Sequence, residues 1–213
     1  MDFVLDQTEV RVLGSLIEKE IATPEYYPLT LNALVNACNQ RSNRDPVVAF
    51  DEDTVESAAD RLREKRLAAV VTGAGMRVAK YRELLSETLN LGRREVALLS
   101  VLMLRGPQTV GELHGRTERL HRFTDLGEVE AVLEQLSTRE PDALVVRLPR
   151  QPGTKEPRYA HLLSGAPEIA VAAPAQAPSS REDRLAALEA EVRRLREEVL
   201  ELRDQLAAFR AQF

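Results

Sequence analysis

The stretch Asp53-Thr54-Val55-Glu56-Ser57-Ala58-Ala59-Asp60-Arg61-Leu62 predicts an amphipathic helix, because its apolar residues recur at spacings of three and four. The same apolar pattern returns 74 positions later in Asp125-Leu126-Gly127-Glu128-Val129-Glu130-Ala131-Val132-Leu133-Glu134-Gln135-Leu136. Both segments begin with an aspartate three residues before a glutamate, which is the form of a capping box. A helix that occurs twice suggests that a larger unit is repeated around it.

Further elements surround the first of these helices. Asp6–Glu9 has the capping-box form and predicts the start of one helix, and Pro28–Thr30 predicts the start of another. Behind the Asp53 helix, Leu67–Val71 and Met76–Tyr81 are rich in strand-forming residues, and Gly73–Gly75 between them predicts a turn. The first 90 residues therefore predict three helices followed by a β-hairpin.

The second copy has the same order of elements. Glu95–Leu104 is apolar nearly all round, so we expect a central buried helix. Thr109–Glu112 is a capping box for the next helix. After the Asp125 helix, Leu144–Leu148 and Arg158–Leu163 predict a second hairpin.

Three helices closed by a hairpin are typical of a winged helix-turn-helix domain, in which the third helix reads DNA and the hairpin is the wing. A generic small α+β domain is the alternative interpretation. We expect an α+β, mainly helical protein with tandem winged-helix domains at residues 1–90 and 91–164. Prolines and alanines predict a linker at 165–180, and residues 181–213 predict a C-terminal coiled-coil helix.

The C-terminal helix carries a heptad pattern. Its predicted dimerisation residues alternate at spacings of three and four: Leu185, Leu188, Val192, Leu195, Val199, Leu202 and Leu206. Valine at a positions with leucine at d positions favours a parallel dimer, and e and g residues such as Glu191 and Arg196 would pair across it. We therefore expect a homodimer. A trimer and a single helix packed on its own domains are the alternatives.

Composition restricts the function. Aromatic residues make up 4% of the chain and Trp is absent, which argues against a stacking platform for single-stranded nucleic acid. The net charge of −5 divides into −4, +1 and −2 for residues 1–90, 91–164 and 165–213, so a DNA site has to be a local patch. With no membrane-length apolar run, no signal-peptide pattern and one cysteine, we expect a cytoplasmic protein without membrane contact.

Several long strings of residues carry a family resemblance: Leu16–Pro24, Leu31–Val47, Leu104–Thr109 and Arg147–Gly153. In these strings the chain resembles the YceH-like family of bacterial tandem winged-helix proteins. The resemblance spans residues 5–164, and the C-terminal tail also looks like that of the family. It implies two winged-helix domains, and it transfers no catalytic residues.

Basic residues of the second domain are the candidates for DNA binding: Arg116, Arg119, Arg122, Arg147, Arg150, Lys155 and Arg158. A basic wing can follow a phosphate backbone or enter a minor groove. The alternative is a solvated loop with scattered charge. The third helices argue against ordinary major-groove docking, because Asp60, Glu130 and Glu134 lie away from their apolar faces and would repel phosphates.

The segment after the second helix is dense in hydrogen-bonding side chains. Its candidates for a binding loop are Asn39, Gln40, Arg41, Asn43 and Arg44. Such a loop would bind DNA, a peptide or a small polar ligand. An internally bonded turn is the alternative, since Asn, Ser and Asp cap helices and turns.

No pattern of catalytic residues is present in the sequence. Cys38 continues an apolar helix face, so we expect a buried thiol. His114, His121 and His161 lack metal-ligand spacing, and there is no phosphate loop or nucleophile elbow. We therefore expect no enzyme, no cofactor and no metal.

Two functions remain open at this stage. The first is a homodimeric, transcription-regulator-like protein that binds double-stranded DNA. The second is a protein–protein interaction adaptor that uses its winged-helix domains without DNA. A continuous basic face through the arginines would support the first function, and an exposed apolar groove between the domains would support the second.

Overall fold

The computed structural model describes residues 3–72, 78–150 and 156–166, which belong to one compact unit, Met1–Glu168. The chain is α+β and mainly helical, as the sequence predicts. Lys155 and most of the predicted linker lie outside the described residues. So does the predicted coiled coil with its dimerisation residues Leu185, Leu188, Val192, Leu195, Val199, Leu202 and Leu206.

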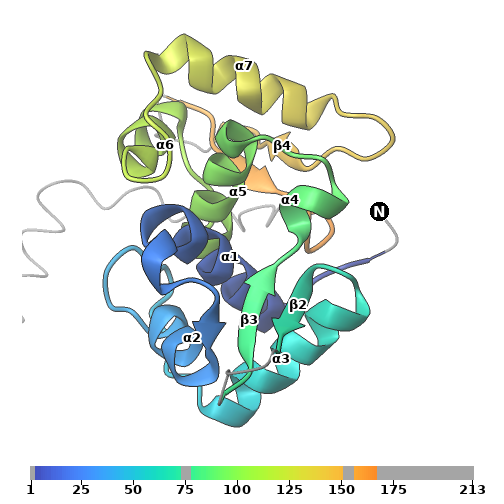
Figure 1. Cartoon of the computed structure of the whole chain (residues 1–213). Helices are drawn as coiled ribbons and strands as arrows, with labels where there is room; N and C mark the ends of the chain where they lie inside the picture. Colours follow the sequence, from blue (N-terminus) through green and yellow to red (C-terminus); the bar gives the residue numbers. More distant parts are fainter. Residues whose placement is uncertain (1–2, 73–77, 151–155, 167–213) are drawn as a thin grey trace, which may run out of the picture. The chain divides into compact units, whose positions relative to one another are not determined.

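The first half of the unit combines helices with a three-stranded antiparallel sheet (Figure 1). In chain order the elements are α1 (Gln7–Ala22), the 3-10 helix η1 (Pro24–Tyr26), β1 (Leu29–Thr30), α2 (Leu31–Cys38), α3 (Glu52–Glu64), β2 (Ala68–Val71) and β3 (Lys80–Glu83). The strand order is β1-β3-β2, and Tyr81 of β3 lies opposite both Leu29 and Val70. Strands β2 and β3 thus pair antiparallel as predicted, and the predicted turn Gly73–Gly75 lies outside the described residues. Strand β3 extends two residues beyond the expected end at Tyr81.

The second half begins with the short helix α4 (Leu85–Thr88), which the sequence did not lead us to expect. It continues with α5 (Arg93–Arg105), α6 (Val110–Thr117), α7 (Leu126–Ser137), β4 (Val145–Arg147) and β5 (Tyr159–His161). Strands β4 and β5 form an antiparallel hairpin in which Val146 lies opposite Ala160. The helices and the hairpin therefore follow the predicted order.

An isolated β-bridge in the second half corresponds to the pairing of β1 with β3 in the first half. Gln108, just before α6, exchanges both backbone hydrogen bonds with Tyr159 of β5, at 3.0 and 2.7 Å. It occupies the place that β1 has in the first half, where Leu29 pairs with Tyr81. The order helix, extended segment, helix, helix and hairpin consequently occurs twice in the unit.

Local hydrogen bonds explain where the helices begin. The Asp6 carboxylate accepts from the Glu9 amide and the Glu9 carboxylate accepts from the Asp6 amide, so the predicted capping box of α1 is confirmed. Thr109 and Glu112 form the same reciprocal pair at the start of α6. Each such cap satisfies amides that have no partner within the helix.

Helix α3 begins earlier than the sequence predicts. We expected Asp53 to cap it, but the N-cap is Asp51, whose carboxylate accepts from the Thr54 amide at 2.9 Å. The Asn39 side chain explains the shift, because it bonds both the amide and the carbonyl of Phe50, at 2.8 and 2.7 Å. This pair of bonds fixes the backbone just before Asp51, and the helix starts there.

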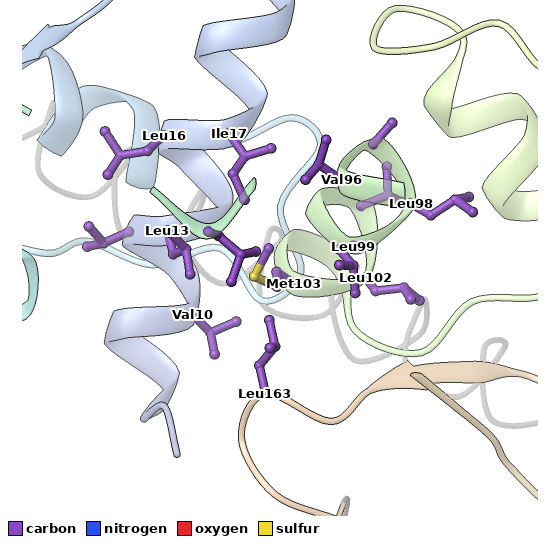
Figure 2. Packing of buried hydrophobic residues seen from close by; sticks show 14 of the residues in the cluster. Val10, Leu13, Leu16, Ile17, Val96, Leu98, Leu99, Leu102, Met103 and Leu163 are labelled. Carbon is purple, nitrogen blue, oxygen red and sulfur yellow. The ribbon is translucent and has the colours of Figure 1, made fainter. Parts of the chain in front are cut away.

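Helices α1 and α5 pack against each other at the centre of the core, and Figure 2 shows Leu13 and Ile17 of α1 facing Leu99 and Met103 of α5. The expectation that α5 is buried all round is confirmed, since every residue from Val96 to Leu104 is buried. The buried cluster includes residues of both halves, which therefore share one core. The domain boundary near residue 90 stays a prediction.

A glycine allows this close packing. A Cβ atom on Gly14 would lie 3.1 Å from the Cβ of Met103 and 3.1 Å from two carbons of Leu104. The Ser100 hydroxyl also donates to the Gly14 carbonyl, at 3.3 Å. A side chain at position 14 would push the two helices apart, and we expect that to disturb the elements attached to their ends.

Candidate functional site

The segment between α2 and α3 is held from inside by Arg44. Its side chain has no exposed surface, and its Nε and Nη2 atoms donate to the Ala37 carbonyl at 3.1 and 2.8 Å. Its two terminal nitrogens also bond the two carboxylate oxygens of Glu18, at 3.1 and 2.6 Å. Arg44, predicted as a binding candidate, thus joins this segment to α1.

A second buried arginine supports the same segment. Arg11 of α1 donates to the carbonyls of Cys38 and Pro46, at 3.0 and 2.6 Å. The Asp45 amide also donates to the Leu104 carbonyl of α5, at 2.9 Å. Burial and the nearby Arg44 lower the pKa of Arg11. Together with the bonds of Asn39 to Phe50, these contacts fix residues 39–50 against both central helices.

The predicted binding-loop residues consequently divide into two groups. Asn39 and Arg44 make internal contacts. Gln40 and Asn43 instead line a hollow with Ser42, while Arg41 is exposed. The segment is therefore a turn bonded from within that presents polar side chains to a hollow, and its role as a binding loop stays a prediction.

Two of the predicted DNA-binding residues line the same hollow. Arg116 lies in the last turn of α6, and Arg119 lies in the turn that follows. The Thr117 carbonyl accepts from the amides of Leu120 and His121, which closes this turn and sets the position of Arg119. Residues that are about 80 positions apart in the chain thus meet around one hollow.

Sequence reasoning missed two further cations of this hollow. Lys19 of α1 and Arg105, the last residue of α5, line it together with Arg116 and Arg119. We call the hollow the basic cleft; its volume is about 470 Å³. Of its lining elements, α6 and the segment after α2 appear on the left side of Figure 1, and α1 lies at the centre. A basic residue in the last turn of a helix is common, so Arg105 gave no distinctive signal in the sequence.

One carboxylate, Glu18, is among the described residues that line the basic cleft. It is already paired with Arg44, and Lys19 Nζ lies 3.1 Å from its Oε2 atom. Burial alone would raise the pKa of Glu18, but the Arg44 guanidinium and Lys19 hold it below its ordinary value. The cations of the cleft therefore outnumber the negative charge within it.

Arg158 of the predicted wing is connected to this site through Glu112. Its Nη1 atom donates to the Pro107 carbonyl at 2.7 Å and lies 3.0 Å from Glu112 Oε2. The other Glu112 oxygen lies 3.6 Å from Arg116. Arg158, Glu112 and Arg116 thus form a row of alternating charge from the residue before β5 to the basic cleft.

The remaining predicted arginines lie elsewhere. Arg147 lines a separate shallow hollow with Glu130, Glu134 and Tyr159. Arg122 and Arg150 are exposed. The carboxylates of Glu130 and Glu134 make the outer face of α7 unfavourable for phosphates, as the sequence indicates.

A second hollow, the apolar hollow, lies between α1, α5 and the segment before α3. It has a volume of about 650 Å³, and Val10, Phe50, Met103 and Ala160 contribute to its lining. His161 also lines it, and burial lowers the pKa of this side chain to about 4. At neutral pH the imidazole is therefore uncharged.

The described residues hold no group of three or more His, Cys, Asp or Glu side chains arranged to bind a metal ion. Cys38 is buried, as expected, and burial raises the pKa of its thiol to about 11. In the part of the chain that the structure describes, no helix is long and apolar enough to span a membrane.

Comparison with known proteins places the chain in a family. A family model described as "Protein of unknown function, DUF480" matches residues 5–154. The chain is 56% identical over 195 residues to a UPF0502 protein of Citrifermentans bemidjiense, with 90% of each chain covered. It is 54% identical to a UPF0502 protein of Solibacter usitatus over an alignment of 216 residues, which covers 100% of each chain. On this evidence the chain belongs to the bacterial DUF480 family, whose similar members are called UPF0502 proteins.

Proposed function

We propose that the protein is a tandem winged-helix protein that binds double-stranded DNA through the basic cleft and its rim. The repeated order of helices and hairpin, with Gln108 in the place of β1, supports the winged-helix assignment. The resemblance to YceH-like proteins supports it as well. The proposal differs from ordinary winged-helix docking, because the acidic outer face of α7 is not the contact surface.

One observation carries the proposal. Four cations from separate elements, Lys19, Arg105, Arg116 and Arg119, converge on one cleft whose carboxylate is already paired. Most contacts between proteins and DNA go to phosphates and sugars, and the cations release counterions on binding. Gln40, Ser42 and Asn43 add neutral hydrogen-bonding groups beside the charges.

The proposal includes a homodimer and a cytoplasmic location. The heptad pattern of residues 181–213 supports the dimer. Two copies of the cleft on one dimer would engage two phosphate segments of the same duplex, which strengthens binding through a high effective concentration.

Fluorescence anisotropy with mixed-sequence duplex DNA, at low and near-physiological salt, tests the proposal. We expect salt-sensitive binding, and we expect Arg119→Glu to weaken it and to reduce the slope of log affinity against log salt by about one. Arg63→Glu is the control, because it changes the net charge equally at an exposed position on α3, away from the cleft. Equal effects of the two variants, or no binding at low salt, would contradict the proposal.

A protein–protein interaction adaptor is the second candidate function. The apolar hollow of about 650 Å³ favours this function, since exposed apolar surface is typical of protein interaction sites. The same titration separates the candidates. Absence of DNA binding at low salt favours the adaptor, whereas salt-sensitive binding that depends on Arg119 favours DNA.

A further inference from the structure

Two of the cations that line the basic cleft are held by hydrogen bonds to the segment after α2. Lys19 has an 18% exposed side chain, and its Nζ atom donates to Gln40 Oε1 at 3.2 Å. Arg105 donates from Nη2 to the side-chain oxygen of Asn43. Because residues 39–50 are themselves fixed by Arg11 and Arg44, these partners hold both cations in place before any ligand arrives.

The charges in the cleft are poorly balanced. Burial lowers the pKa of Arg105, and the guanidinium groups of Arg116 and Arg44 lower it further, while the carboxylates of Glu18 and Asp45 oppose the shift without cancelling it. Glu112 lies 3.6 Å from Arg116, but it also pairs with Arg158 at 3.0 Å. Arg105 and Arg116 therefore repel each other across the cleft, and a bound anion would relieve that repulsion.

The cleft also has an apolar part. Val101 and Leu104 of α5 and Leu120 of the turn after α6 line it beside the cations. Its volume of about 470 Å³ lies within the range of about 300–1,000 Å³ that is typical of small-molecule sites. A DNA backbone would contact the cations but would leave these apolar edges unused. The combination suits a small molecule with an anionic end and a flat or apolar end.

We propose that the basic cleft binds a nucleoside phosphate, with the phosphate groups against Arg105, Arg116 and Lys19. The base would lie beside exposed Ala22, over the edges of Leu104 and Leu120, which are 3% and 6% exposed. Charge-assisted hydrogen bonds from paired guanidinium groups suit phosphate oxygens. The inference that the nucleotide also competes with DNA rests on the proposed function. Arg116 and Arg119 belong to both surfaces, so a bound nucleotide competes with DNA for the cleft.

Isothermal titration calorimetry of the full chain with ATP in magnesium-free, low-chloride buffer tests the site. We expect ATP to bind, adenosine not to bind measurably, and inorganic phosphate to bind more weakly than ATP. Loss of one charge-assisted hydrogen-bonding group in Arg105→Gln should weaken ATP binding roughly tenfold or more. Arg63→Gln, an exposed arginine on α3, is the matched control and should leave binding unchanged.

A second variant guards against a folding defect in Arg105→Gln. Ala22 is exposed and lines the cleft, so Ala22→Phe would fill the space while leaving every cation in place. We expect it to weaken ATP binding without changing the circular dichroism spectrum. The nucleotide proposal is overturned if ATP fails to bind, if adenosine binds equally well, or if neither cleft variant changes the affinity.

Competition anisotropy then separates this inference from the proposed function. If ATP displaces duplex DNA and Arg105→Gln weakens the displacement, both stand. If DNA binds and ATP does not, the nucleotide site is overturned while the proposed function stands. If ATP binds at the cleft and DNA does not bind at all, the nucleotide site stands and the proposed function fails. If ATP binds at the cleft but does not displace bound DNA, the nucleotide site stands and the proposed competition between nucleotide and DNA is overturned.

Discussion

Arg44 and Glu18 form a two-point ion pair, with nitrogen–oxygen distances of 3.1 and 2.6 Å, between the segment after α2 and helix α1. The Arg44 side chain is fully buried and that of Glu18 is 12% exposed. On α3, Arg63 and Asp60 make a pair of the same 2.6 Å distance, but both of its side chains are about half exposed. The two pairs differ mainly in burial.

Arg44→Met should cost about 3–5 kcal/mol of unfolding free energy, because it leaves the Glu18 carboxylate without its main partner in a buried place. Arg63→Met removes an exposed pair and should cost about 0–1 kcal/mol. Urea denaturation at neutral pH measures both values. Similar losses for the two variants would show that Arg44 does not hold the segment.

The same ion pair predicts sensitivity to acid. Burial would raise the pKa of Glu18, but Arg44 and Lys19 lower it below its ordinary value. The stabilisation is therefore complete above the unfolded carboxyl pKa of about 4.3, and it is lost as the pH falls through the lower folded value. Urea denaturation across this range should show that Arg44→Met loses less stability in acid than the parent protein does. If the unfolding free energies of the two proteins fell in parallel with pH, the Arg44–Glu18 pair would not be the cause of the acid sensitivity.

Gly14 and Gly115 predict opposite effects of the same substitution. Gly14→Ala places a methyl group 3.1 Å from Met103 and Leu104, so we expect a loss of about 1–3 kcal/mol from overpacking. Gly115 lies in α6 with nothing within 4 Å of an added Cβ, so Gly115→Ala should stabilise by about 0.4–1 kcal/mol. Thermal denaturation measures both. A stabilised Gly14→Ala variant would mean that α1 and α5 separate at little cost.

The helices and hairpins were predictable because their signals are local. Asp6 with Glu9, and Thr109 with Glu112, lie within one helical turn, so the sequence shows the interacting groups directly. The start of α3 was not predictable, because Asp51 and Asp53 are both suitable caps and a contact with Asn39 selects between them. That contact depends on how the chain folds between two helices.

The basic cleft was predictable only in part. Arg116 and Asn43 were separate candidates, but nothing in the sequence indicates that they line one hollow. Lys19 and Arg105 looked like ordinary surface charges at helix ends. Arg11 was missed for a related reason: charged residues are rarely buried without a partner, and its partners are backbone carbonyls 27 and 35 residues away.

The heptad residues predict that the C-terminal segment sets the oligomeric state. Replacing Leu195 and Leu202 together by glutamate places like charges at successive d positions, and we expect a monomer where the parent chain is a dimer. Sedimentation velocity measures the change. Ala190→Glu and Ala208→Glu together, at positions f and c off the apolar seam, add the same charge and are the control. A dimer that survives both leucine substitutions would place the interface within residues 1–164.

Glu20 and Glu83 predict a further dependence on pH, of opposite sign to that of Glu18. Burial raises the pKa of Glu20 to about 7, and the hydrogen bond and negative charge of Glu83 contribute. Arg82 opposes the shift and Glu87 adds to it. Glu83 is itself buried, and its carboxylate accepts from the Ser86 amide at 3.1 Å. At low pH the protonated carboxyl group of Glu20 therefore donates a hydrogen bond to the carboxylate of Glu83.

Because the folded pKa of Glu20 lies above the unfolded value of about 4.3, the protein loses stability as the pH rises between these values, and the penalty is complete above the folded pKa. Glu20→Gln keeps a neutral hydrogen-bond donor, so it should stabilise the protein at about pH 8.5 and have little effect at about pH 5. Glu25→Gln, at an exposed position in η1, is the control and should show no such difference. Urea midpoints at the two pH values decide the question, and a stabilisation that is equal at both would exclude a shared proton between Glu20 and Glu83.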